Sequence, residues 1–116
     1  MNRQTFKCGD IYLIDFDPSV GHEYKKQRPA IIIQATETLT RSHLVTIMPL
    51  TSQVNKKLPE DILVCKDLKN QLFSNSVIKV HSIVSFDESR FIKKIGVLSH
   101  EIINQVKKYL RIHFEL

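Results

Sequence analysis

The chain has 116 residues, which is enough for one small domain and leaves little room for a second hydrophobic core. Its apolar content of 42% and charged content of 25% are ordinary for a globular protein, and no apolar run approaches the roughly 20 residues of a membrane span. The 17 Lys and Arg residues outnumber the 12 Asp and Glu residues, and the net charge is +5. Such a charge fits a polyanionic partner or simply solubility. We expect a single domain over residues 1–116 with no membrane attachment.

The N-terminal residues lack the apolar stretch of a secretory signal, which favours a cytoplasmic protein. Cys8 and Cys65 lie far apart, and neither belongs to a Cys/His cluster with metal-ligand spacing. Two free or buried thiols in a reducing cytosol are the expected state, and a disulfide is the alternative. The cysteines therefore give no sign of a metal site.

Short strand-like segments dominate the chain. They are rich in β-branched and aromatic residues and are bounded by turn-forming residues. Their expected ranges are 11–16, 30–33, 44–50, 61–65 and 76–80, with residues 83–86 either continuing the last or forming a sixth strand. Several short strands without a long helix between them favour a mainly β domain, a small antiparallel or mixed barrel, over an α/β sheet.

The C-terminal segment has the pattern of an amphipathic α-helix. Ser99 is the expected N-cap, and Glu101 stands in the first turn, where a carboxylate suits the helix dipole. Apolar residues recur at helical spacing at Ile102, Ile103, Val106, Tyr109, Leu110 and Phe114. We expect this face to pack against the barrel, with partner binding as the alternative. Short helical turns are expected at 38–42 and 66–70.

One loop between two buried strands concentrates reactive side chains. The chain leaves the first strand through Asp17-Pro18 and re-enters the core directly after Arg28-Pro29. In between it carries an acid, an imidazole and several cations: His22, Glu23, Lys25, Lys26 and Arg28. These are the group types needed to move protons around a phosphodiester without a metal ion.

Four short motifs occur together in the first half of the chain. They are Gly9-Asp10-Ile11-Tyr12, Gly21-His22-Glu23, Arg28-Pro29 and Pro49-Leu50-Thr51-Ser52. Each alone is weak, but the joint set is specific. With weaker matches later in the chain, it resembles the MazF/PemK family of toxin endoribonucleases, the toxin half of type II toxin–antitoxin pairs. The resemblance extends over nearly the whole chain.

The resemblance implies an SH3-like β-barrel with a C-terminal α-helix, assembled as a homodimer. The implied activity is metal-free cleavage of single-stranded RNA at short sequence motifs, with no cofactor. Its expected products are a 2′,3′-cyclic phosphate and a 5′-hydroxyl. The implied protein partner is an antitoxin whose disordered acidic segment covers the RNA groove.

The resemblance also assigns roles to individual residues. Arg28 stands at the family's arginine, where a guanidinium with paired donors stabilises the transition state. Thr51 and Ser52 are expected to bind a phosphate oxygen or to orient the leaving group. His22 lines the site in the Kid/PemK branch and is a candidate base or acid, while Glu23 positions the loop or Arg28. Without the resemblance, these residues would be read as surface and turn positions.

The fifth predicted strand departs from the family pattern. Where the Kid/PemK branch has a catalytic arginine and aspartate two positions apart, this chain has Lys79 and His81. Side chains two apart on a strand share one face, so we expect Lys79 to hold the phosphate and His81 to act as acid or base. The alternative is a polar strand face without chemistry. The family's Arg-Thr-Ile-Asp element corresponds to residues 84–87, which lack the arginine. The family's Gly-Leu corresponds to Gln71-Leu72 in this chain.

Further residues are expected to contact RNA outside the reacting centre. Tyr24 is a candidate for stacking on a base, although it equally suits a core or an interface. We expect four lysines to follow the RNA backbone: Lys25, Lys26, Lys56 and Lys57. We expect two side-chain amides to read base edges: Gln53 and Asn55. The other histidines, His43, His100 and His113, form no constellation in the sequence.

Two other functions remain open at this point. A gyrase-binding toxin on the same barrel acts through a protein contact without catalysis, but that related family uses a tryptophan near its C-terminus, and this chain has none. A non-catalytic nucleic-acid-binding barrel would explain the charge. It would not explain why His22, Glu23, Arg28 and Thr51 occur together.

Overall fold

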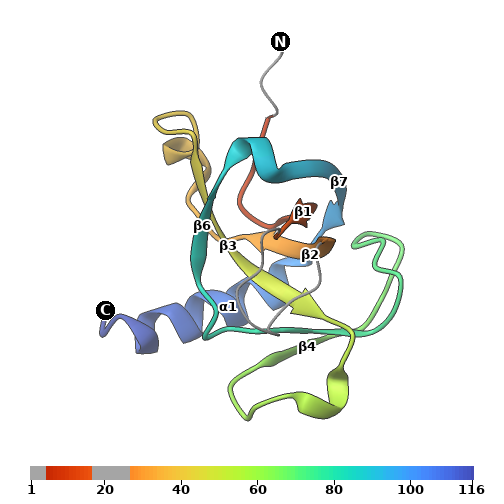
Figure 1. Ribbon diagram of the computed structural model, residues 1–116. Helices are drawn as coiled ribbons and strands as arrows, with labels where there is room; N and C mark the ends of the chain where they lie inside the picture. The colour runs from red at the N-terminus through yellow and green to blue at the C-terminus, as the bar shows by residue number, and fades with distance from the viewer. Residues whose placement is uncertain (1–4, 17–26) are drawn as a thin grey trace.

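The computed structural model describes residues 5–16 and 27–116 (Figure 1). Within these residues the chain forms seven strands, three short 3-10 helices and one α-helix. The strands are β1 (Asp10–Asp15), β2 (Gln27–Ile32), β3 (Leu44–Thr51), β4 (Ile62–Val64), β5 (Ser76–Ile78), β6 (Val84–Asp87) and β7 (Phe91–Val97). The helices are η1 (Thr36–Thr38), η2 (Val54–Lys56), η3 (Glu88–Arg90) and α1 (His100–His113).

All seven strands belong to one antiparallel sheet, in which six follow the order β4-β5-β3-β2-β1-β7 and β6 pairs with β3 outside this order. Strand β3 is the hub, because it pairs with β2 and β5 and, through its first half, with β6. Among the described residues no ladder joins β4 to β7, so the sheet is not closed. The prediction of a mainly β domain with a C-terminal helix is confirmed.

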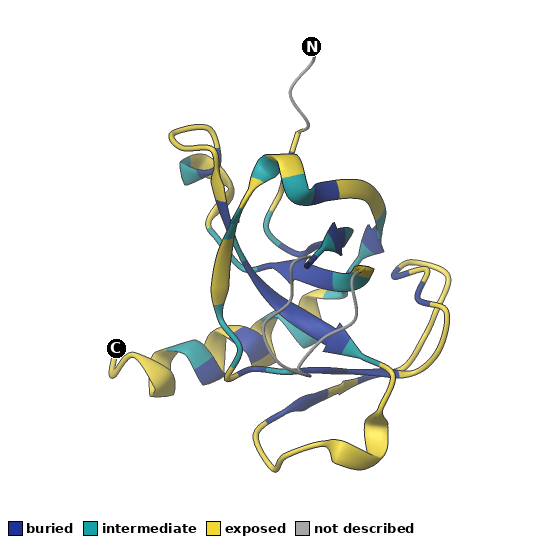
Figure 2. Cartoon of the chain, viewed as in Figure 1, coloured by how far each residue is buried: buried dark blue, intermediate teal, exposed yellow. Residues whose placement is uncertain are grey.

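Two hydrophobic clusters cover the two faces of the central strands. Most of β2 and β3 is accordingly buried (Figure 2). Along β2, Ile31 belongs to the cluster that packs against α1, while Ala30 and Ile32 belong to the second. This alternation follows from the two-residue period of a strand. Because both faces of β2 and β3 are covered, their apolar runs are nearly continuous, as the sequence indicated.

Strand β7 is not among the predicted strands. It pairs with β1, but the register shifts between Ile11 and Tyr12 and again between Leu13 and Ile14. Such irregularities break the alternation of buried and exposed positions. The exposed Lys93 and Lys94 therefore stand next to each other in the middle of the strand, and the sequence shows no period of two.

The predicted fifth strand is shorter than expected. Strand β5 ends at Ile78, and the Ser82 amide donates to the Lys79 carbonyl at 3.1 Å, which closes a turn. Residues 84–87 form β6, which pairs with β3 instead of continuing β5. The expectation that Lys79 and His81 share the face of one strand is therefore wrong.

Helix α1 begins as predicted. The Ser99 hydroxyl accepts a hydrogen bond from the Ile102 amide at 3.3 Å, and Val106 and Tyr109 are buried against the sheet. Phe114 was expected on the same buried face, but it lies just past the end of the helix and is 54% exposed. No helix in the described part of the chain has the length and hydropathy of a membrane span.

Both cysteines are free thiols in the structure, with Cys8 partly buried and Cys65 exposed. The expected helical turn at 38–42 corresponds to η1, which lies slightly earlier at Thr36–Thr38. Residues 66–70 contain a turn but no helix.

Candidate active site

Strands β2 and β3 bring Arg28 and Thr51 together. Ala30 on β2 pairs with Pro49 on β3 in an antiparallel register. Arg28 lies two residues before Ala30 and Thr51 two residues after Pro49, so both stand at the same end of the strand pair and on the same face. Residues that are 23 positions apart in the sequence thus become neighbours across two strands.

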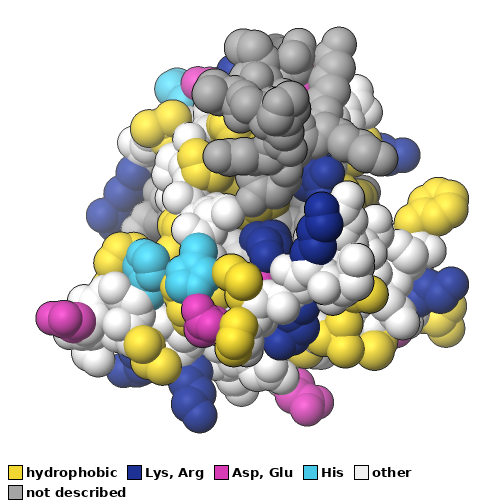
Figure 3. Space-filling model, turned by 60° about the horizontal axis from the view of Figure 1, so that its bottom comes forward, with side chains coloured by type: hydrophobic (Ala, Val, Ile, Leu, Met, Phe, Trp, Pro, Cys, Tyr) yellow, Lys and Arg dark blue, Asp and Glu magenta, His cyan; other side chains and the backbone are white. Residues whose placement is uncertain are grey.

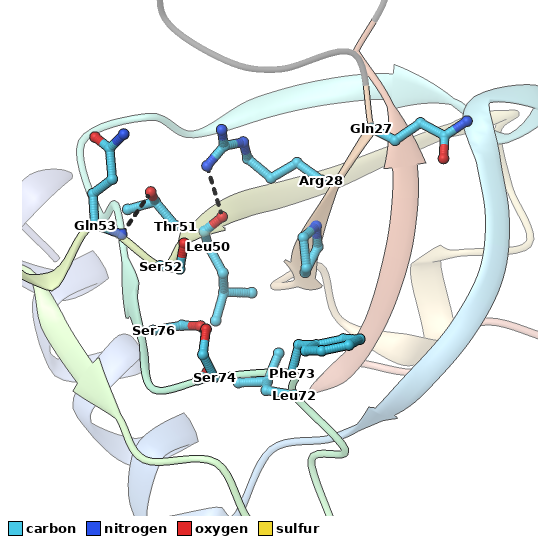
Figure 4. Close-up of a pocket in the computed structure, with 11 residues that line it drawn as sticks. Gln27, Arg28, Leu50, Thr51, Ser52, Gln53, Leu72, Phe73, Ser74 and Ser76 are labelled. Atoms are coloured by element: carbon cyan, nitrogen blue, oxygen red, sulfur yellow. Dashed lines mark hydrogen bonds between the residues drawn. The ribbon is translucent and has the colours of Figure 1, made fainter.

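A pocket of about 210 Å³ lies at this end of the sheet (Figure 4). The Arg28 side chain extends along its upper edge, and its Nη1 donates to the Leu50 carbonyl at 3.5 Å. The Thr51 hydroxyl accepts from the Gln53 amide at 3.2 Å, which fixes the start of the following loop. The lining residues are Gln27, Arg28, Pro29, Leu50, Thr51, Ser52, Gln53, Leu72, Phe73, Ser74 and Ser76.

The described lining of this pocket suits an anion. It combines one guanidinium with the hydroxyls of Thr51 and Ser52, and none of these eleven residues is acidic. Guanidinium groups bind phosphate oxygens through paired, charge-assisted hydrogen bonds. The pocket can therefore hold a phosphate group and stabilise added negative charge on it.

The pocket unites three of the predicted site residues beyond Arg28. Thr51, Ser52 and Gln53 line it, and the last two are exposed. Lys56, on η2, does not line it. Five predicted residues lie outside the described part of the chain: His22, Glu23, Tyr24, Lys25 and Lys26.

Lys79 is held by a buried acid. Its Nζ lies 2.6 Å from Asp61 Oδ2, and a second contact reaches the Lys56 carbonyl at 3.5 Å. Burial by itself raises the pKa of the Asp61 carboxyl, but the hydrogen bond from Lys79 and those from the Leu58 and Val80 amides outweigh it and lower the pKa below its ordinary value. Lys79 does not line the pocket that contains Arg28, which we call the Arg28 pocket.

His81 belongs to a hydrogen-bonded chain that reaches α1. Its Nε2 lies 2.5 Å from a Glu60 carboxylate oxygen, and its Nδ1 lies 2.9 Å from the Tyr109 hydroxyl. The same hydroxyl lies 2.8 Å from Nδ1 of His113. On the face drawn in Figure 3, histidine side chains gather next to acidic and basic ones. We call Glu60, His81, Tyr109 and His113 the His81 chain.

The His81 chain has one consistent set of donors when both histidines are neutral. The hydrogen bond from His81 lowers the pKa of Glu60, so the carboxylate accepts from Nε2–H. The other ring nitrogen of His81 must then accept, and Tyr109 donates to it. Burial is the main cause that raises the pKa of the Tyr109 phenol, which keeps it protonated. The Tyr109 oxygen accepts from His113 Nδ1–H.

Several residues of both regions could not be recognised from the sequence. Phe73 and Ser74 line the pocket from the loop before β5, a segment with no strand or helix pattern. Glu60 and Tyr109 contact His81, although each lies more than 20 residues from it along the chain. His113, for which no constellation was expected, completes the His81 chain. The sequence shows only that polar residues follow the ends of the predicted strands. This pattern does not show which of these residues contact one another.

Comparison with known proteins gives the chain a family. It is 28% identical over 113 residues to Endoribonuclease MazF9 of Mycobacterium tuberculosis, covering 93% of this chain and 95% of that protein. Its fold matches the crystal structure of MazF from Deinococcus radiodurans with a TM-score of 0.81 and 20% identity, over 98% of this chain and 100% of that one.

A third relative is an endoribonuclease in complex with its cognate antitoxin from a mycobacterial species. It has a TM-score of 0.73 and 15% identity, with coverage of 98% and 97% of the two chains. The model of the PemK-like, MazF-like toxins of type II toxin–antitoxin systems matches residues 7–114, which include the Arg28 pocket and the His81 chain. The chain therefore belongs to the PemK-like, MazF-like family of type II toxin–antitoxin toxins.

Proposed function

We propose that this MazF/PemK-family toxin is an endoribonuclease that cuts single-stranded RNA without a metal ion. The observation that supports this is the pocket in which Arg28 and Thr51 meet at the ends of β2 and β3. A guanidinium beside hydroxyls suits a phosphodiester, whose negative charge grows at the phosphorus during cleavage. The name of the M. tuberculosis relative supports the same activity.

In the proposed reaction the ribose 2′-hydroxyl attacks the adjacent phosphorus while a base removes its proton. The bond from phosphorus to the 5′-oxygen breaks, and an acid protonates that oxygen. The products are a 2′,3′-cyclic phosphate and a 5′-hydroxyl. Arg28 stabilises the phosphorane through charge-assisted hydrogen bonds, and the Thr51 hydroxyl binds a phosphate oxygen or the leaving oxygen. Ser52 and Gln53 contact the neighbouring parts of the substrate.

We assign proton transfer first to His22, which precedes Arg28 by six residues, because an unperturbed imidazole can take up or release a proton near neutral pH. His81 is the alternative acid or base. Glu60 and Tyr109 engage both of its ring nitrogens, so its use requires one of these partners to move. Lys79 is assigned to positioning, because its ammonium pairs with Asp61.

The remaining proposals concern partners. The net charge of +5 supports binding of an RNA strand along basic side chains, for which we propose Lys25, Lys26 and Lys56. We propose further contacts to the RNA from Glu23 and Tyr24. A cognate antitoxin with an acidic segment would compete for the same charges, and the mycobacterial complex supports such a partner. We propose a cytoplasmic homodimer as the working form.

The activity is tested with the purified protein, EDTA and a defined single-stranded RNA. We expect fragments with 5′-hydroxyl ends, and we expect no cleavage of the same sequence with 2′-O-methyl groups, because the attacking hydroxyl is blocked. Intact RNA that is bound by the protein would instead support a non-catalytic barrel. Intact RNA without binding would favour a toxin that acts on a protein target.

A further inference from the structure

The loop between β4 and β5 is held rigidly by its own side chains. The Asp67 carboxylate accepts from the Lys69 and Asn70 amides at 2.9 and 2.7 Å. The buried Asn70 side chain accepts from the amides of Asp67 and Leu72, both at 3.0 Å, and donates to the Cys65 carbonyl at 2.9 Å. Satisfied buried amides of this kind fix a loop in one conformation.

The same loop is fixed against the sheet. The Val97 amide on β7 donates to the Lys69 carbonyl at 3.1 Å. A Cβ on Gly96 would stand only 2.3 Å from the Asn70 carbonyl oxygen, so glycine is required for this close approach. Gln71 has a φ of 56°, which turns the chain sharply between Asn70 and Leu72. The position of the next residues is therefore set by the fold.

What this rigid loop presents to solvent is an aromatic ring. Leu72 points into the core and is 7% exposed, whereas Phe73 is fully exposed at 101%. Figure 4 shows Phe73 beside Leu72, below the Arg28 side chain at the rim of the pocket. The ring contributes no buried surface to the described fold, and exposing it to water is unfavourable. A fully exposed aromatic side chain at the rim of a polar pocket, carried by a loop whose backbone is held by hydrogen bonds, points to a planar ligand.

We propose that Phe73 is a stacking platform for an RNA base next to the phosphate held by Arg28. The proposal rests on the proposed function. Single-stranded RNA is bound mainly by stacking of splayed bases on aromatic rings combined with cations for the backbone, and this pocket offers both. The Ser74 hydroxyl, next in the chain and also lining the pocket, can bind the edge of the stacked base. Phe73 therefore contributes to substrate affinity and to sequence preference at one position.

The chain contains no tryptophan, so one introduced at this position reports on its surroundings alone. We would titrate Phe73→Trp with a 2′-O-methyl oligonucleotide, which binds without being cut. Stacking on a base should quench the tryptophan emission strongly. Leu68→Trp is the matched control, since Leu68 is on the same loop and 92% exposed but does not line the pocket. We expect little change in its emission.

Affinity and cleavage give the second readout. Stacking on one aromatic ring corresponds to about a 5- to 100-fold change in affinity, so Phe73→Ala should raise the Kd for the 2′-O-methyl oligonucleotide and the KM for RNA by a factor in this range. Phe73→Trp should bind as the wild type does, and Leu68→Ala should change the Kd less than twofold. End mapping of cleaved RNA should show relaxed base preference at one position for Phe73→Ala. Because Phe73 is exposed, the melting temperature should not change.

These outcomes separate this inference from the proposed function. If the wild type cleaves RNA and Phe73→Ala has an unchanged KM, Kd and cleavage pattern, the stacking proposal is wrong and the function stands. Failure of the wild type to cleave RNA while the oligonucleotide still quenches Phe73→Trp would refute the function alone. An emission change that follows protein concentration without RNA would assign Phe73 to contacts between protein copies and overturn the proposal.

Discussion

The Arg28 pocket and the His81 chain are both polar regions at strand ends, yet their polar groups are used differently. In the pocket, a guanidinium and the hydroxyls of Thr51, Ser52, Ser74 and Ser76 line a space of about 210 Å³. In the His81 chain, Glu60 and His113 end a line of four side chains joined by hydrogen bonds within 2.9 Å. Glu60 and Tyr109 of the His81 chain also line a hollow of about 690 Å³, so the two regions differ in how their polar groups are paired and not in the presence of space. Polar groups that are hydrogen-bonded to one another join segments of the fold.

The charges of the two regions differ as well. No acidic residue is among the described residues that line the Arg28 pocket, but the His81 chain contains Glu60, and the next residue in the sequence is Asp61. Both carboxyls have a lowered pKa and are ionised at neutral pH. Like charges repel, so the phosphate of RNA is favoured at the pocket and disfavoured near these two acids. We therefore propose that the first region carries the chemistry and that the second attaches α1 to the sheet.

Among the conservative substitutions, the largest effect is expected from Arg28→Lys. Lysine keeps the positive charge but loses the planar fork of donors that matches two phosphate oxygens. We expect the rate of RNA cleavage to fall about 100-fold, as when a donor to a developing oxyanion is removed. Single-turnover rates measured in EDTA test this. A loss of less than threefold would mean that Arg28 supplies only a diffuse charge.

Asp61→Asn should have the next largest effect, on stability. It leaves the Lys79 ammonium without its carboxylate, and because Lys79 is partly exposed we expect a loss of about 2 kcal/mol, below the range for fully buried pairs. The folded-state pKa of Asp61 lies below its ordinary value of 3.8, so this stability is present above pH 3.8 and is lost as the pH falls through the folded-state pKa.

Urea unfolding of the wild type and of Asp61→Asn between pH 2.5 and 7 measures this dependence. The difference between the two proteins should be largest at neutral pH and shrink below about pH 3.8. Lys57→Ala, which removes a nearby exposed lysine, is the control and should be neutral. An equal difference at every pH would show that the pair does not titrate as described.

Thr51→Val tests the hydroxyl in the pocket with almost no change of shape. Valine cannot bind a phosphate oxygen and cannot accept the hydrogen bond from the Gln53 amide. We expect a fall in the cleavage rate of about tenfold, near 1.4 kcal/mol. Thr51→Ser keeps the hydroxyl and should recover most of the rate. Equal losses in both variants would assign the effect to packing.

Tyr109→Phe should have the smallest effect and bears most directly on the role of the His81 chain. It removes the hydroxyl between His81 and His113, and we expect a loss of stability of about 1 kcal/mol with cleavage within threefold of the wild type. Thermal unfolding and cleavage rates over pH 5 to 9 measure both. A tenfold slower reaction or a shifted pH profile at unchanged stability would place His81 at the reacting centre.

Much of this molecule follows from its sequence. The strands around Ile11, Ile31 and Ile47 are covered on both faces, so their apolar runs identify them, and the cap at Ser99 identifies the start of α1. Strand β7 was missed because its register shifts remove the alternation on which such predictions depend. Local pattern predicts an element where burial is regular and fails where pairing is irregular.

Some residues of the candidate site could likewise be predicted from the sequence, and others could not. Arg28 and Thr51 could be predicted, because each belongs to a motif next to a buried strand. The position of His81 could not, since a turn at 79–82 redirects it towards α1 and its partners Glu60 and Tyr109 are distant in sequence. The exposure of Phe73 could not be predicted either, because it depends on side chains elsewhere in its loop.

We propose that the Arg28 pocket is the reacting centre for cleavage of RNA. The most direct test is the single-turnover rate of cleavage in EDTA by Arg28→Ala and by Arg41→Ala, which removes an exposed arginine outside the pocket. We predict a loss of at least 100-fold for the first and less than twofold for the second, with both proteins folded. Equal rates for the two variants would contradict the account.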